Sequence, residues 1–240
     1  MNNLILIRHG QSIWNLKRRF TGWADVDLTD NGKSEARYAG QLLKKMNIEF
    51  DAYFTSVQKR AINTLEIILD ILNKKNSETK KAWELNERHY GALTGLNKDE
   101  MIKKHGKKQV HIWRRSFDVP PPPMEKTNPN HPSKNKAYIN IPNNKIPSCE
   151  SLKNTFERVM PYYKENIAPL LLSQKNILIS AHGNSLRALC KKLLNISNRK
   201  IVELEIPTGN PLLIVLEKNL KIKQYKYLDA KRAKKILFNI

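Results

Sequence analysis

The stretch LILIRHGQS, residues 4–12, contains the strongest fold signal in this chain. Its first four residues are apolar, and a short run of this kind predicts a strand buried on both faces, as in a parallel sheet. Arg8 and His9 follow where that strand should end. Ligands of open α/β sheets bind outside the carboxyl ends of the strands. We therefore expect Arg8 and His9 at a binding site, where Gly10 lets backbone amides approach an anion.

A second segment repeats this pattern late in the chain. Residues 176–181, NILISA, predict another buried strand, and His182, Gly183 and Asn184 follow it directly. A lone histidine is more often structural than catalytic. Here, however, two strands each end in a histidine followed by a glycine, and both should end at the same sheet edge. This pairing favours a catalytic site there.

Strands and helices alternate along most of the chain. Further strands are expected at 51–55 and 212–216, and helices at 29–45, 61–72, 151–173 and 183–194. The helix at 151–173 should be interrupted or bent near Pro161 and Pro169. This alternation predicts one α/β domain over residues 1–240, a three-layer α/β/α sandwich with a mostly parallel central sheet.

Composition restricts the setting of the protein. The 240 residues are 40% hydrophobic, enough for a sizeable core, and no apolar run approaches the roughly 20 residues of a membrane span. The N-terminus has neither the basic region nor the long apolar region of a signal peptide. Cys149 and Cys190 are too few for a disulfide framework, so we expect a cytoplasmic protein without a membrane partner.

The net charge of +21 has three interpretations. It could belong to a nucleic-acid binder, to an enzyme for small polyanions, or to a chain with the Lys, Asn and Ile usage of AT-rich genomes. We favour the last, because the lysines are spread along the chain. The chain also has no helix-turn-helix, zinc-finger or RNP-like pattern, so no specific nucleic acid is expected.

The histidines and arginines suit phosphoryl transfer. A neutral imidazole can attack phosphorus, and fixed cations and N–H donors must stabilise the charge of the transferring group. Arg8 and Arg60 could supply bidentate contacts. His182, Asn15 and the amide of Gly183 could complete the cage. No metal is expected, because the arginines can do this work and the histidines lack zinc-site spacing.

Several motifs, taken together, resemble the cofactor-dependent phosphoglycerate mutases of the histidine phosphatase superfamily. They occur in the family's order over residues 4 to about 216. Arg-His-Gly at 8–10 alone would indicate only the superfamily. The mutase branch is indicated by the further motifs FTGW (20–23), TSVQKRA (55–61), LNERHYG (85–91), WRR (113–115) and AHGNSLR (181–187).

The resemblance implies a ping-pong interconversion of 3-phosphoglycerate and 2-phosphoglycerate. His9 would carry the phosphoryl group, and 2,3-bisphosphoglycerate would prime the enzyme. Glu87 matches the general acid/base of the family, and Arg8, Arg60 and His182 complete the catalytic set. The family's habits suggest a homodimer or homotetramer.

The resemblance also implies a set of substrate-binding residues. Arg114, Arg115, Lys98 and Tyr90 match positions that hold the substrate's carboxylate and distal phosphate. The remaining residues of this set are Gln11, Ser12, Asn15, Thr21, Gly22, Arg88, His89, Gly183 and Asn184. The tryptophans are interpreted as packing residues.

Another enzyme of the superfamily, a phosphatase, is the main alternative. It would share His9, Arg8, Arg60 and His182 but would let water attack the phosphohistidine. The motifs between residues 85 and 115 favour the mutase, because they supply groups that can hold a second anionic end.

Residues 116–147 and the end of the chain depart from the family's pattern. Residues 97–147 include Pro120-Pro121-Pro122-Pro123 and are interpreted as a Pro-rich insertion, either a lid over the active site or a disordered loop. We favour the lid, because Trp113, Arg114 and Arg115 flank the proline run. The basic tail at 229–240 would approach the active site in relatives, but here it could be frayed or pack elsewhere.

Overall fold

The computed structural model describes residues 1–233, and in this part of the chain six strands form one sheet in the order β3-β2-β4-β1-β5-β6. Neighbouring strands from β3 to β1 are parallel, whereas β5 and β6 are antiparallel additions at one edge. The mostly parallel α/β sandwich is therefore confirmed. The strands are β1 (Asn2–Arg8), β2 (Ala52–Thr55), β3 (Thr79–Lys81), β4 (Ile177–Ala181), β5 (Leu212–Leu216) and β6 (Ile222–Tyr227).

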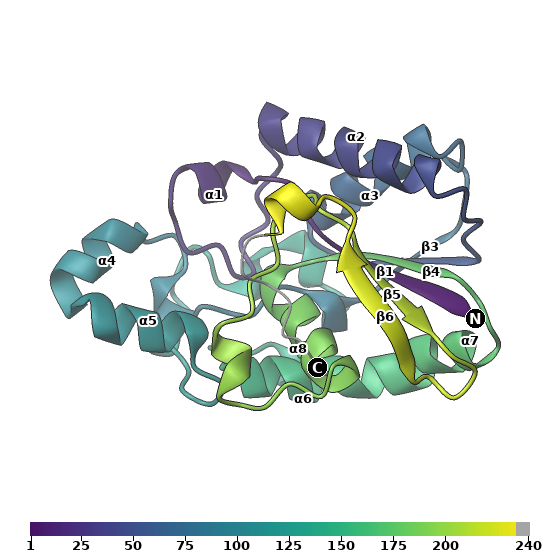
Figure 1. The fold of residues 1–240 in the computed structure, drawn as a ribbon. Coiled ribbons are helices and arrows are strands. Elements are labelled where there is room, and N and C mark those ends of the chain that lie inside the picture. Colours follow the sequence, from purple (N-terminus) through teal and green to yellow (C-terminus); the bar gives the residue numbers. More distant parts are fainter. Residues whose placement is uncertain (234–240) are drawn as a thin grey trace.

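Helices cover both faces of the sheet. Figure 1 shows α2 and α3 on one face and α6, α7 and α8 on the other, with α4 and α5 projecting beyond the sheet. The helices are α1 (Ile13–Leu16), α2 (Asp30–Lys45), α3 (Lys59–Ile71), α4 (Lys98–His105), α5 (Lys107–Arg115), α6 (Leu152–Tyr162), α7 (Ala168–Leu172) and α8 (Gly183–Leu193).

The central strand β1 is buried on both faces, as its apolar run predicts. Leu4 and Leu6 pack into the core under α6 and α8, whereas Ile5 and Ile7 pack into the core under α2 and α3. All four side chains are fully buried. Alternate side chains of a strand point to opposite faces, so this single run joins both cores.

The predicted interruption of the 151–173 helix is also confirmed. Pro161 lies inside α6, and Pro169 lies at the start of α7. Between them the chain forms a π-helical turn at Tyr163–Ile167. A proline cannot donate the backbone hydrogen bond of a regular helix, which accounts for the irregular turn.

The segment 97–147 contains more regular structure than the loop expected from its prolines. Its first part forms the hairpin of α4 and α5, with Asn97 capping α4 and Gly106 turning the chain at φ +81°. The rest contains short 3₁₀ turns, and Tyr138 is buried there against Trp23. The segment is therefore packed onto the domain, and its action as a lid stays a prediction.

The parallel pairing of β1 with β4 positions the two histidines. Arg8 pairs with Ala181, so His9 and His182 leave the sheet side by side. The backbone N–H of His9 donates to the carbonyl of Ala181 at 3.0 Å. Within residues 1–233, no helix is long and apolar enough to cross a membrane.

The C-terminal segment returns to the same sheet edge before residue 234. Asp229 caps a 3₁₀ turn at Ala230–Arg232, and its backbone bonds to Asn210. Residues 234–240 of the basic tail, for which fraying or packing elsewhere was the expectation, lie outside the described residues.

Candidate active site

The buried ring of His9 presents one defined nitrogen to the cavity. Its Nδ1 lies 2.7 Å from the carbonyl oxygen of Gly10, and its Nε2 lies 3.3 Å from Nε of Arg60. A carbonyl can only accept and a guanidinium can only donate, so the proton of His9 belongs on Nδ1. The lone pair therefore belongs on Nε2, the form that a nucleophile requires.

Burial keeps His9 in this neutral form. Desolvation lowers the pKa of His9 well below its usual value, and the positive charges of Arg60 and Arg8 lower it further. His9 is only 2% exposed, so water can do little to offset these effects. The imidazole is therefore uncharged at neutral pH.

His182 stands directly behind His9. The centroids of the two rings are 5.0 Å apart, close enough for both rings to touch one phosphoryl group. Ser56 Oγ lies 2.7 Å from His182 Nε2, whereas Nδ1 is buried and finds no hydrogen-bond partner among residues 1–233. If Ser56 donates to Nε2, Nδ1 carries the proton and is an unused donor for an anion.

Arg60 is held in place mainly by backbone carbonyls. It is fully buried on α3, and it donates to the carbonyls of Gly22 and Ala24 and to the side chain of Gln58. Its Nε points to His9. Arg8 donates to the carbonyl of Ile206, while its Nε has no partner in the described part of the chain.

Glu87 has one engaged carboxylate oxygen and one available oxygen. Its Oε1 accepts from the backbone N–H of Arg88 and from both the backbone and side-chain amides of Asn184, at 2.8–3.1 Å. Within residues 1–233, Oε2 accepts no hydrogen bond, and it faces Gly183 at the start of α8. A carboxylate anchored through one oxygen can exchange a proton through the other.

The far end of the cavity is built by the hairpin of α4 and α5. Lys98 comes from the first turn of α4, and Arg114 and Arg115 come from the last turn of α5. Burial lowers the pKa of Lys98 and of Arg114, as expected of cations that have lost water. Tyr90 stands beside them. Its burial raises its pKa, but the charge and hydrogen bond of Arg88 and the charge of Arg114 together outweigh this, and the pKa falls to about 8.

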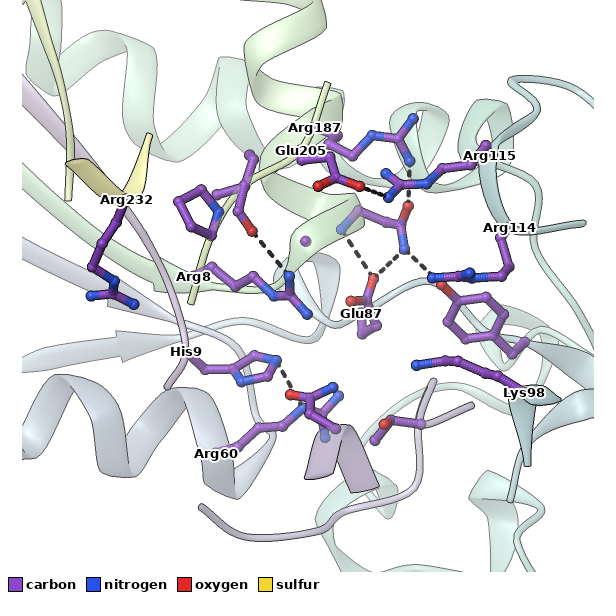
Figure 2. A pocket seen from close by; sticks show the side chains of 17 residues that line it. Arg8, His9, Arg60, Glu87, Lys98, Arg114, Arg115, Arg187, Glu205 and Arg232 are labelled. Atoms are coloured by element: carbon purple, nitrogen blue, oxygen red, sulfur yellow. Dashed lines mark hydrogen bonds and ion pairs between the residues drawn. The ribbon is translucent and has the colours of Figure 1, made fainter. Parts of the chain in front are cut away.

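These side chains enclose a cavity of about 390 Å³. Figure 2 shows Arg8, His9 and Arg60 at one side, Lys98, Arg114 and Arg115 at the other, and Glu87 between them in this view. The lining of residues 1–233 contains seven Lys or Arg side chains and only two acids. No group of three or more His, Cys, Asp or Glu in this part of the chain could hold a metal ion. The site suits a small ligand with two anionic ends.

Most of the sequence-predicted site residues line this cavity. They are Arg8, His9, Asn15, Thr21, Arg60, Glu87, Tyr90, Lys98, Arg114, Arg115, Gly183 and Asn184. His182 lies behind His9. The other five do not line the cavity formed by residues 1–233. They are Gln11, Ser12, Gly22, Arg88 and His89.

Those five residues have identifiable structural contacts. Ser12 caps α1, and the carbonyl of Gly22 accepts from Arg60. Arg88 is fully buried, lies over the ring of Tyr90 and donates to the carbonyl of Arg114. The ring of His89 accepts from the amide of Gly91, and Gln11 bonds to residues of and before α2.

The structure adds five lining residues that the motifs did not single out as site residues: Arg187, Glu205, Ile206, Pro207 and Arg232. Arg187 lies one helical turn after Asn184 and donates to it, a spacing that could have indicated its role. Glu205, which forms an ion pair with Arg115, and Arg232 carry no such local signal.

Sequence comparisons identify relatives along the whole chain. The model of the histidine phosphatase superfamily (branch 1) matches residues 4–131. A 2,3-bisphosphoglycerate-dependent phosphoglycerate mutase from Pelagibacter ubique is 56% identical over 99% of each chain. The protein of the same name from Hydrogenobaculum sp. is 52% identical, over 100% of this chain and 98% of its own. A third, from Hyphomonas neptunium, is 54% identical over 97% of each chain.

Solved structures share the fold at lower identity. A mycobacterial glucosyl-3-phosphoglycerate phosphatase superposes with a TM-score of 0.69 at 19% identity, over 95% of this chain and 97% of its own. The alpha-ribazole phosphatase from Shigella flexneri gives the same TM-score and identity over 99% of this chain and 100% of its own. The family model and the three relatives place the chain in the histidine phosphatase superfamily, within its family of 2,3-bisphosphoglycerate-dependent phosphoglycerate mutases.

Proposed function

We propose that this protein interconverts 3-phosphoglycerate and 2-phosphoglycerate, an isomerase reaction of glycolysis and gluconeogenesis, through a phosphohistidine on Nε2 of His9. The observation that carries the proposal is the placement of His9, which lines a cavity with cations at both ends and has its Nδ1 on the carbonyl of Gly10 and its Nε2 beside Arg60. The relatives named as 2,3-bisphosphoglycerate-dependent mutases, at 52–56% identity, support the same reaction.

The arrangement of donors fits 2,3-bisphosphoglycerate as the primer. Nε of Arg8 and Nδ1 of His182 are buried near His9 without partners in residues 1–233, and Nε of Arg187 is unpaired among the same residues. Buried donors of this kind are costly unless a ligand satisfies them. When bound, the primer supplies the phosphoryl group, and Lys98 and Arg114 would hold its far end.

His9 is the nucleophile in this mechanism. As the Nε2–P bond forms and the P–O bond to the donor breaks, charge spreads over the three phosphoryl oxygens. Arg8, Arg60 and His182 stabilise that charge from fixed positions, so little reorganisation is needed at the moment of transfer. Nδ1–H stays on the carbonyl of Gly10 throughout.

Glu87 is the group that moves the proton. When a hydroxyl of the substrate attacks the phosphohistidine, Oε2 accepts its proton, and it returns the proton to the oxygen left behind in the reverse transfer. Asn184 and the amide of Arg88 hold Oε1, which keeps Oε2 directed at the substrate. The cations at the far end hold the carboxylate and the phosphate that is not reacting. Between the two transfers the bound bisphosphate turns, so that its other phosphate reaches His9.

The cellular setting follows from the proposed reaction. Glycolytic substrates and the two free cysteines support a cytoplasmic location. The homodimer or homotetramer implied by the family stays a prediction, to be measured by light scattering.

Phosphate mapping tests the proposal. After brief incubation with 2,3-bisphosphoglycerate, mass spectrometry should locate an acid-labile phosphate on His9, and His9→Ala should abolish it. A coupled assay should give formation of 2-phosphoglycerate that depends on the primer. Label that persists in His9→Ala would refute the assignment of His9, and phosphate release that outruns 2-phosphoglycerate formation would favour a phosphatase.

A further inference from the structure

The peptide group between Gly10 and Gln11 is hydrogen-bonded at both its carbonyl and its N–H. Its carbonyl oxygen, on Gly10, lies 2.7 Å from Nδ1 of His9. Its N–H, on Gln11, donates to Oε2 of Glu35 at 2.7 Å. One rigid, planar unit thus connects the carboxylate of Glu35 to the ring of the nucleophile.

Glu35 is well placed for such a role. It lies on α2, and its side chain is 17% exposed. Its other oxygen, Oε1, accepts from the hydroxyl of Thr208 at 2.8 Å and from Nη2 of Arg232 at 3.1 Å. The partners of both oxygens, Gln11, Thr208 and Arg232, are all donors. The site therefore suits an ionised carboxylate, whereas the NH₂ group of an amide would face another donor.

The start of α2 leaves the catalytic loop little freedom. A Cβ at Gly10 would lie 2.1 Å from the carbonyl oxygen of Gly32, and a Cβ at Gly32 would lie 2.1 Å from that of Gln11. The amide of Thr29 donates to the carbonyl of Gln11 at 2.9 Å. The loop is therefore seated against α2 by direct backbone contact, and Glu35 is the charged group in this contact.

We propose that Glu35 is a positioning residue for His9 and acts through the Gly10–Gln11 peptide group. A negative charge on the N–H side polarises the peptide and makes its carbonyl a stronger acceptor. The stronger acceptor holds the proton on Nδ1 and the lone pair on Nε2. The proposal rests on His9 being the phosphoryl carrier, and it adds the group that selects its tautomer.

The first test reads the tautomer directly and needs no turnover. In protein labelled with ¹⁵N-histidine, the His9 signals are identified by their loss in His9→Ala. The wild type should give a protonated Nδ1 and a bare Nε2. Glu35→Gln should move both shifts toward the average of two tautomers. Unchanged shifts in a folded Glu35→Gln protein would overturn the proposal.

The second test measures phosphorylation of His9 by rapid quench. Glu35→Gln should slow it by about 10–100-fold, the range seen when a group that orients a metal-binding histidine is lost, while KM stays within about twofold. A wild-type rate would overturn the proposal. If the wild type itself takes up no phosphate, the proposed function fails, whereas the tautomer test still decides the role of Glu35.

Thr208→Val is the matched control. It removes a hydrogen bond to Oε1 of the same carboxylate and leaves the contact of Oε2 with Gln11. The ¹⁵N shifts and the phosphorylation rate should stay at wild-type values. Equal losses in Thr208→Val and Glu35→Gln would indicate general loosening and would overturn the proposal. If Glu35→Gln fails to fold, Glu35→Asp replaces it. Its side chain is shorter by one methylene group, so its carboxylate should not reach the N–H of Gln11, and the same changes are expected.

Discussion

At the scale of single residues, the site depends on which atoms are already occupied. His9 has its Nδ1 on a carbonyl, and Glu87 has its Oε1 on three amide donors. Within residues 1–233, the second oxygen of Glu87 is left for the substrate, whereas Nε2 of His9 accepts only the long contact from Nε of Arg60 at 3.3 Å. These contacts fix the orientation of the proposed nucleophile, His9, and of the proposed acid/base, Glu87.

Glu87→Gln tests the acid/base role. The amide keeps an oxygen for Asn184 but cannot exchange a proton, so kcat should fall by about 10²–10⁴-fold with little change in KM. The coupled mutase assay measures both. Glu100→Gln, an exposed acid on α4, is the control and should behave like the wild type. An unchanged turnover number would remove Glu87 from this role.

At the scale of elements, the hairpin of α4 and α5 provides the far end of the site. Arg114→Ala should raise the KM for phosphoglycerate by about 10–150-fold, because a hydrogen bond to a charged group contributes roughly 1.5–3 kcal/mol. Steady-state kinetics with the primer saturating measures the effect. Lys103→Ala removes an exposed cation from the same hairpin and should leave KM unchanged. An equal rise of KM in Arg114→Ala and Lys103→Ala would show that the loss of any positive charge from the hairpin weakens binding, and would contradict a specific contact of Arg114 with the substrate.

Helix α6 supports the loop that carries Glu87. Its Arg158 forms a buried ion pair with Glu150 and donates to the carbonyls of Glu84 and Glu87. Glu150 in turn accepts from the amide of His89. One buried guanidinium therefore connects α6 to the segment that positions Glu87, the proposed acid/base.

Arg158→Met should cost about 3–5 kcal/mol of unfolding free energy, because it leaves Glu150 buried and unpaired. Urea denaturation measures it. Lys153→Met, on the same helix, loses only an exposed pair with Glu157 and should change the stability by about 0–1 kcal/mol. A loss below about 1 kcal/mol in Arg158→Met would contradict the importance of the buried pair.

At the scale of the whole molecule, three buried histidines couple stability to pH. Burial is the main cause that lowers the pKa of His9 and of His182 well below 6.5, and that of His89 to about 4. In the unfolded chain these rings take up protons near pH 6.5. The unfolded state then binds more protons than the folded state, so acid favours unfolding.

The protonation of these histidines should therefore make stability fall as the pH drops through 6.5, by up to about 1.4 kcal/mol per pH unit for each histidine. Urea denaturation between about pH 7.5 and 5.5 measures the slope. His111→Gln removes an exposed histidine and should leave that slope unchanged. Equal stability at both ends of this range would contradict the buried, neutral state of the three rings.

Local patterns predicted much of this molecule. The residues that directly follow a strand, Arg8, His9, Gly183 and Asn184, could be placed because parallel strands end at one edge of a sheet. The hairpin of α4 and α5 was missed, because its many lysines and the prolines after it resemble a loop. The edge strands β3 and β6 were missed too, because mostly polar, exposed strands lack the apolar signal of a buried one.

The sequence by itself determined the two-faced apolar strands, the helices between them and the pairing of two histidines at one edge, because each follows from short-range periodicity and chain direction. Only the tertiary structure decided that Arg232 comes to the cavity and that Glu35 reaches the peptide after Gly10. Those contacts join residues far apart along the chain, and they depend on the conformation of the side chains involved. Such geometry is set by packing across the whole molecule, which no local pattern encodes.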